Sequence, residues 1–276
     1  MITMSRAWNI KNEDFYRFLR ANRKLAAATA KILIDFLPIG FIDLSEKEIT
    51  EFYFKLLDSD NLSSSTKHNT HYAVKYLCEF KGWPFDYKMP KVHRVRRKNI
   101  EMEDVKKLLH VITNQNHKIL ILTHLYTGLR PSELLNLKLE DLDLERGLLE
   151  IRNTKTYRDR SIPLHQTLLG GLKDYLSHRD EHTDYLFQSK GQQSKVSLDA
   201  YRWMLEKYSK AANIKKVTPY SLRHTFATLF VENSGDILIL KKIMGHSDIH
   251  TSEAYIHDNP RMIQKGYDKA QISWGD

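Results

Sequence analysis

Hydrophobic side chains recur every three or four residues through residues 1–87, which is the spacing of one face of an α-helix. Residues that favour helix starts and stops divide this stretch into four predicted helices. They are expected after Asn12, within residues 25–37, after Ser45 with Glu48 in a capping box, and from Ser63 to Gly82. We therefore expect a small helical bundle, and no group of polar residues in it suggests chemistry.

The same spacing continues beyond residue 99 and predicts a larger helical domain. Helices are expected at about 104–112, 117–126, 165–177, 197–212, 219–232 and 237–244. Gly128 should end the second of these in a left-handed conformation, and Pro131 should open a further helix. Residues 148–152 and 160–163 are short extended runs around a polar, basic tip, which predicts a hairpin. The fold class should be mainly α, with one small antiparallel sheet in the second domain.

A basic segment separates the two predicted domains. Between Lys88 and Lys98 there are six lysines and arginines and no acid, and Pro90 interrupts the run. We expect a bundle over residues 1–87, a linker over 88–98 and a second domain over 99–276. A basic linker is either a solvated spacer or a segment that lies along nucleic acid. The expected phosphate contacts are Lys91, Arg94, Arg96, Arg97 and Lys98.

Composition narrows the classes of protein further. The chain of 276 residues holds 43 Lys and Arg against 34 Asp and Glu, a formal charge of +9, which is typical of proteins that bind phosphate-rich partners. The single cysteine, Cys78, excludes an internal disulfide framework. No apolar run approaches a membrane span, and the N-terminus has no signal-peptide core. We expect a cytoplasmic protein associated with nucleic acid.

Three segments of the second domain carry a joint pattern. They are TGLRPSELL at 127–135, SLRHTFAT at 221–228, and MGHS at 244–247, which Tyr255 follows nine residues after His246. Together they resemble the tyrosine recombinase (phage integrase) family, and most closely its compact Xer-type members. The resemblance covers residues 99–258, and the first bundle agrees in size and position with the family's core-binding (SAM-like) domain.

Arg130 and Arg223 are the residues for which the chemistry can be argued independently of the resemblance. Each stands near a predicted helix start, where backbone N–H groups favour anions. Two guanidinium forks on one phosphate would donate several charge-assisted hydrogen bonds where negative charge builds up in phosphoryl transfer. The alternative for each arginine alone is a surface ion pair, with Glu133 as the candidate partner of Arg130.

The resemblance implies roles for three further residues. Tyr255 would be the nucleophile that forms a 3′-phosphotyrosyl bond, and Lys155 on the hairpin would protonate the leaving 5′ oxygen. His246 would contact a non-bridging phosphate oxygen. The alternatives are a hairpin lysine that only touches DNA backbone, as Arg158 is expected to do, and a histidine that caps a helix after Gly245.

Tyr220 departs from the family pattern. Most relatives have a histidine three residues before the second arginine, where it contacts the phosphate and handles a proton. A tyrosine can donate one hydrogen bond but does not exchange a proton near pH 7 as imidazole does. We expect a slower or differently tuned enzyme that still cuts DNA.

The resemblance also implies an assembly. Two domains would form a C-shaped clamp around duplex DNA, and four protomers would assemble on two sites, with no cofactor, no membrane and no small-molecule substrate. An apolar stripe near the C-terminus would dock in a neighbour or pack on its own domain. Its members are Met262, Ile263, Gly266, Tyr267 and Ala270.

Other function classes make different demands on the sequence. A metal-dependent nuclease or transposase needs converging carboxylates, and the acids at 140–145 and 180–181 lack ligand spacing. A zinc site could use His246, His250 and His257. A further alternative is a recombinase relative that only binds or shapes DNA and does not cut it. Tyr220 is the only residue that favours this alternative. The sequence leaves the target site open, as well as the choice between chromosome-dimer resolution and integration of a virus or plasmid.

Overall fold

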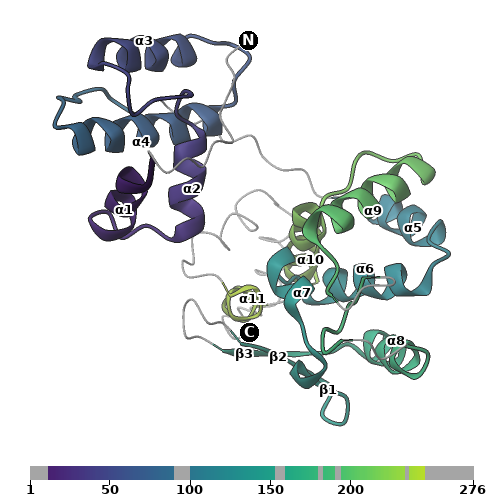
Figure 1. Ribbon diagram of the computed structural model, residues 1–276. Coiled ribbons are helices and arrows are strands. Elements are labelled where there is room, and N and C mark those ends of the chain that lie inside the picture. The colour runs from purple at the N-terminus through teal and green to yellow at the C-terminus, as the bar shows by residue number, and fades with distance from the viewer. Residues whose placement is uncertain are drawn as a thin grey trace, which may run out of the picture. The chain divides into compact units, whose positions relative to one another are not determined.

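A computed structural model describes residues 12–89, 100–152, 159–179, 183–189, 194–233 and 236–245 of the chain (Figure 1). The chain divides into two compact units, Met1–Arg96 and Arg97–Asp276. This division falls within the segment 88–98 that we predict as a linker. The mainly helical class with one small antiparallel sheet is confirmed.

The first unit contains four helices in its described part: α1 (Glu13–Ala21), α2 (Ala27–Asp35), α3 (Glu46–Leu57) and α4 (Ser64–Lys81). The predicted capping box of Ser45 and Glu48 opens α3, and Gly82 ends α4 in the left-handed conformation. Asn12 precedes α1 as expected, but its side chain makes no capping hydrogen bond. Phe15, Leu19, Ile49 and Leu77 are fully buried where the helices meet.

The second unit is built around one buried helix. Its elements are α5 (Met102–His110), α6 (Gln115–Thr127), α7 (Pro131–Asn136), the 3₁₀ turn η2 (Leu139–Asp141), β1 (Leu142–Asp143), β2 (Leu148–Ile151), β3 (Arg160–Pro163), α8 (Gln166–Ser177), α9 (Leu198–Ala211), α10 (Pro219–Glu232) and α11 (Ile237–Met244). Helix α6 packs against α8 and α10. Its consecutive residues Ile119, Leu120 and Ile121 are all buried, because neighbours cover more than one of its faces.

The sheet has the strand order β1-β2-β3 and is antiparallel throughout. The predicted hairpin strands are present, with Ile151 of β2 paired to Arg160 of β3. The two-residue strand β1 was not predicted, because so short a strand has no alternation to recognise. The pairing of β2 and β3 fixes the start of β3, and with it the position of Arg160.

A close approach of α6 and α10 makes Gly128 necessary at the end of α6. Its φ of +58° is left-handed, and a Cβ there would lie 2.1 Å from the ring of Phe226 on α10. The chain therefore turns sharply at Gly128 and enters α7 three residues later. This turn places Arg130 at the start of α7.

The described helices include none that is long and apolar enough to cross a membrane. The apolar stripe of Met262, Ile263, Gly266, Tyr267 and Ala270 lies outside the described residues.

Candidate active site

Arg223 lies on α10, one turn after Pro219, and only 7% of it is exposed. Thr218 and Ser221 cap the start of this helix through reciprocal hydrogen bonds. The guanidinium of Arg223 donates from Nη1 to the carbonyl oxygen of Gly128 at 2.7 Å and from Nη2 to that of Met244 at 2.8 Å. Arg223 therefore ties the end of α6 to the end of α11.

Arg130 is the residue that caps the start of α7, with Pro131 at the first helical position. Its Nη2 donates to the carbonyl oxygen of Gly245 at 2.6 Å, and its Nη1 donates to Oε1 of Glu133 at 2.9 Å. The guanidinium is therefore held by the Glu133 carboxylate, the partner that the sequence offered, and by the negative end of α11, which the sequence did not indicate.

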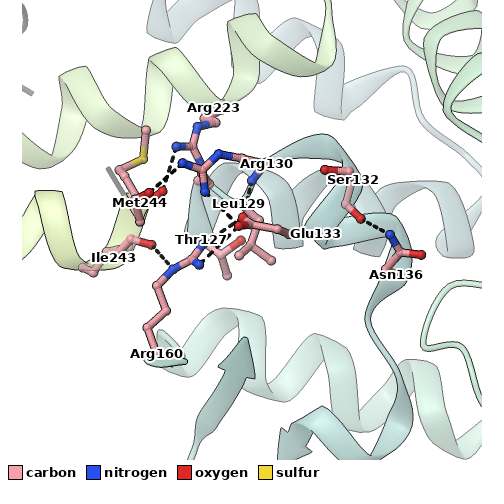
Figure 2. Close-up of polar contacts among 12 residues, drawn as sticks. Thr127, Leu129, Arg130, Ser132, Glu133, Asn136, Arg160, Arg223, Ile243 and Met244 are labelled. Carbon is pink, nitrogen blue, oxygen red and sulfur yellow. Dashed lines mark hydrogen bonds and ion pairs between the residues drawn. The ribbon is translucent and has the colours of Figure 1, made fainter. Parts of the chain in front are cut away.

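The structure brings Arg130 and Arg223 together, although 93 positions separate them in the chain (223 − 130). Their guanidinium groups bind the carbonyl oxygens of Met244 and Gly245, which are consecutive in the chain. Figure 2 shows the two side chains next to each other at the end of α11. The side chain of Arg130 is 36% exposed, so a bound anion could reach it. The expected ion pair between Arg130 and Glu133 is confirmed, and phosphate binding by Arg130 stays a prediction.

Arg160 is a third member of this cluster, and sequence reasoning missed it. It opens β3, and its side chain is only 10% exposed. Its Nη1 and Nη2 donate to the two oxygens of Glu133 at 3.2 and 2.8 Å, and its Nε donates to the carbonyl oxygen of Ile243 at 2.8 Å. The only signal in the sequence is that Arg160 stands two residues before the buried Ile162, on the same strand face.

The cluster keeps an excess of positive charge. Among the residues that the structure describes, the cluster holds the three guanidinium groups and the Glu133 carboxylate, a formal sum of +2 (3 − 1). Burial alone would raise the pKa of Glu133, but hydrogen bonds and charge from Arg160 and Arg130 outweigh it and hold the pKa below its ordinary value. Glu133 therefore stays ionised and orients the arginines, while the remaining charge suits a phosphate.

A buried histidine supports the turn that carries Arg130. The Nε2 of His124 lies 2.9 Å from the carbonyl oxygen of Leu129, and its Nδ1 lies 2.9 Å from the hydroxyl of Tyr201. Because a carbonyl only accepts, Nε2 carries the proton and Nδ1 accepts from Tyr201. Burial lowers the pKa of His124 to about 3, helped by the nearby charge of Arg223, while the bond to Leu129 opposes this shift.

We expect this histidine to make the folded state sensitive to mild acid. In the unfolded chain its pKa is near the ordinary 6.5, so between that value and about 3 the unfolded state binds more protons. Its contribution is complete above pH 6.5 and is lost as the pH falls, by ~2 kcal/mol between pH 7 and pH 5. Urea denaturation at both pH values measures it. His124→Gln keeps a donor and an acceptor but does not titrate, so an unchanged pH dependence in that variant would contradict the assignment.

The structure describes only some of the predicted site residues. Tyr220 lies in the first turn of α10, three residues before Arg223, and is 50% exposed. Lys155, His246 and Tyr255 lie outside the described residues, as do the predicted DNA contacts Lys91, Arg94, Arg96, Arg97, Lys98 and Arg158. Two described residues lie close in sequence to residues that the structure does not describe. Arg160 follows the hairpin tip that holds Lys155, and Gly245 directly precedes His246.

The acidic stretch after α7 is occupied by its own ion pairs. Asp141 accepts the backbone N–H of Lys138 and pairs with Arg152, which also pairs with Glu140. In the part of the chain that the structure describes, no three His, Cys, Asp or Glu side chains gather as metal ligands would. The three histidines considered for zinc fall outside that part.

The helical fold, the small sheet and the paired arginines define the class of protein, a tyrosine recombinase. The phage integrase family matches residues 98–262. The chain is 36% identical over 207 residues to tyrosine recombinase XerA of Pyrococcus furiosus, covering 72% of each chain. It is 30% identical over 196 residues to tyrosine recombinase XerC of Thermodesulfovibrio yellowstonii, covering 65% of this chain and 64% of that one. The chain belongs to the phage integrase family and is Xer-like within it.

Solved structures show the same fold. A crystal structure of XerA recombinase is similar with a TM-score of 0.57 and 26% identity, covering 96% of this chain and 100% of that one. The Tn1549 transposon integrase in complex with circular intermediate DNA is similar with a TM-score of 0.74 and 20% identity, covering 94% and 99%.

Proposed function

We propose that this chain is a site-specific recombinase that cuts and rejoins DNA strands through a 3′-phosphotyrosyl intermediate. The observation that carries the proposal is the convergence of Arg130 and Arg223 on adjacent carbonyl groups at the end of α11. Guanidinium groups held in place before the phosphate arrives can stabilise the charge that develops on its oxygens, without reorganising during the reaction.

The remaining chemistry is assigned to residues beside this cluster in the sequence. The phenolic proton of Tyr255 passes to solvent water, which the nearby positive charge favours, and its oxygen attacks the phosphorus. The bond to the 5′ oxygen breaks as Lys155 supplies a proton to that oxygen. The phosphotyrosyl bond keeps the energy of the broken phosphodiester, so a 5′ hydroxyl of another strand can attack it and release the tyrosine. His246, next to the Gly245 carbonyl that holds Arg130, contacts a non-bridging oxygen. The reaction needs no metal ion or ATP.

Tyr220 takes the place that a histidine holds in most relatives. Its exposed position three residues before Arg223 is compatible with one hydrogen bond to the phosphate. A hydrogen bond of this kind positions the phosphate but does not accept a proton from the tyrosine nucleophile at neutral pH. We propose a recombinase that cuts more slowly than one with histidine.

DNA is the proposed partner, and two observations support it. The chain has a formal charge of +9, and similar solved structures include XerH bound to its difH substrate, at a TM-score of 0.64. The linker residues and Arg158 would bind backbone phosphates, and binding would weaken steeply with salt because counterions are released. The two units would close around the duplex as a clamp. A tetramer on two sites and a place on the nucleoid in the cytoplasm complete the proposal.

The decisive experiment is to incubate the chain with a nicked suicide substrate in EDTA. The substrate carries the recombination site, found by mapping cleaved positions on candidate DNA. We expect a covalent protein–DNA adduct, which denaturing electrophoresis separates from free DNA. Adduct formation would also show that Tyr220 supports the chemistry. Cleavage that requires Mg²⁺ would contradict the proposal in favour of a metal-dependent nuclease.

A DNA-binding relative without catalysis is the second candidate function, and the departure at Tyr220 is the observation that favours it. The same experiment separates the two. Specific binding to the mapped site with no adduct after long incubation would support this second candidate.

A further inference from the structure

Arg160 connects three parts of the site. Its guanidinium contacts both oxygens of Glu133 on α7 and the carbonyl oxygen of Ile243 on α11, while its backbone belongs to β3. Figure 2 shows Arg160 approaching Glu133 and Ile243 from the side of the sheet, whereas Arg130 and Arg223 lie beyond Glu133. Arg160 uses all three guanidinium nitrogens for Glu133 and the end of α11. Among the described residues, Arg130 makes two such bonds, one to Glu133 and one to Gly245.

The carboxylate that Arg160 holds is the one that holds Arg130. Glu133 accepts from the backbone N–H of Arg130 at 2.8 Å and from its Nη1 at 2.9 Å. The two oxygens of Glu133 are therefore shared between two arginines. When a buried, planar guanidinium binds both oxygens of a carboxylate, the carboxylate has little freedom to rotate. Arg130, which binds the same carboxylate, is therefore restrained as well.

The end of α11 is fixed by Arg160 in a second way. Gly245 has a left-handed φ of +61°, and a Cβ there would lie 2.9 Å from Nη1 of Arg160 and 3.2 Å from Nη1 of Arg130. The backbone of Gly245 is thus packed directly on the two guanidinium groups. Its carbonyl oxygen is the acceptor for Arg130, so a change at Arg160 would move both acceptors that Arg130 uses.

We propose that Arg160 is a positioning residue for strand cleavage: through Glu133 and the end of α11 it fixes the orientation in which Arg130 receives the phosphate. This inference rests on the proposed function of the site. Its buried side chain, with all three nitrogens engaged, distinguishes Arg160 from a residue that binds DNA. The restraint costs nothing at the moment of reaction, since the contacts already exist without DNA.

The first test is Arg160→Lys, which keeps the charge but replaces the planar fork with one ammonium. Lysine cannot hold both oxygens of Glu133 and the Ile243 carbonyl in the same geometry. We expect the single-turnover rate constant for adduct formation to fall about 100-fold, the effect of a reacting group displaced by about 1 Å. The Kd for DNA should change less than threefold. An unchanged rate constant, or an equal loss of DNA affinity, would overturn the proposal.

A double-mutant cycle then tests whether Arg160 acts through Arg130. Once Arg130→Lys has removed the fork that Arg160 positions, adding Arg160→Lys should slow cleavage no further than about twofold. Independent roles would instead multiply, and the double variant would be slower by the product of the two single effects. Multiplying effects would refute positioning through Arg130.

Two further measurements separate this role from a general loss of stability. Arg146→Lys is the matched control, because Arg146 lies in an exposed turn where it pairs with Asp143, and it should leave the cleavage rate unchanged. Thermal melting gives the fraction of each variant that is folded, and each rate constant is calculated per folded molecule. If Arg160→Lys lowered only the amount of folded protein, with a normal rate for the folded molecules, Arg160 would be structural and the proposal wrong.

One readout needs no DNA chemistry. In ¹H–¹⁵N spectra of arginine Nε–Hε groups, the signal of Arg130, identified by its loss in Arg130→Lys, should move toward that of exposed arginines in Arg160→Lys. An unmoved signal would overturn the proposal. If the wild-type chain formed no adduct, the proposed function would fail, while this spectrum would still decide whether Arg160 orients Arg130.

Discussion

Tyr255→Phe is expected to abolish the covalent protein–DNA adduct, lowering its rate of formation by roughly 10⁴-fold or more. Phenylalanine keeps the ring but has no oxygen to attack the phosphorus, so neither cleavage nor rejoining can begin. DNA affinity should be nearly unchanged, because the substitution leaves the phosphate contacts proposed for the arginines and the basic linker in place. The measurements are denaturing electrophoresis of the suicide-substrate reaction and a binding titration with the same DNA.

Tyr126→Phe is the matched control for the loss of one phenolic hydroxyl. Tyr126 lies at the end of α6 in the same unit, and its ring stacks on His165. This variant should form the adduct at the wild-type rate. If Tyr255→Phe still formed a covalent adduct, a different residue would be the nucleophile, and the spacing from His246 would have misled us.

Arg223→Lys is expected to give the second largest effect, a loss of about 10³-fold in cleavage rate. Lysine keeps the charge but cannot hold the carbonyl groups of Gly128 and Met244 while also facing a phosphate with a planar fork. Stability should fall as well, by about 1–3 kcal/mol, because one buried carbonyl group loses its donor. Single-turnover kinetics and urea denaturation measure the two effects separately.

Arg202→Lys provides the comparison for this substitution. Arg202 lies on α9 in the same unit and pairs with Asp199 on the surface, so it should change neither quantity by more than experimental error. A cleavage rate for Arg223→Lys within threefold of the wild type would show that the two arginines do not act on the phosphate together.

Local sequence signals predicted most of the described elements. The capping box at Ser45, the left-handed glycines at 82 and 128 and the proline at 131 each act within one helical turn, so their effect can be recognised without the rest of the fold. The bounds predicted for α10 and α11 agree with the structure. The two-residue strand β1 escaped prediction because its pairing with β2 depends on a neighbour.

The orientations of the side chains at the site depend on contacts between residues far apart in the sequence. The helix start at Arg130 and its ion pair with Glu133 were predicted correctly, because both are local. Its bond to the carbonyl of Gly245 was not predicted, because that residue lies 115 positions further along the chain. Arg160 looked like one of several basic residues on a hairpin. Only the pairing of β3 with β2 and the packing of α11 turn it toward Glu133.

The sequence by itself determined the helical periodicity, the caps and turns, and the order of the three motifs that identify the family. These properties depend on residues that are only a few positions apart in the sequence. The tertiary structure decided that Arg130 before α7, Arg160 on β3 and Arg223 on α10 meet at the carbonyl end of α11, where Arg130 and Arg160 also bind Glu133. Hydrogen bonds between residues 83 to 115 positions apart form only when the elements pack, so no local pattern specifies them.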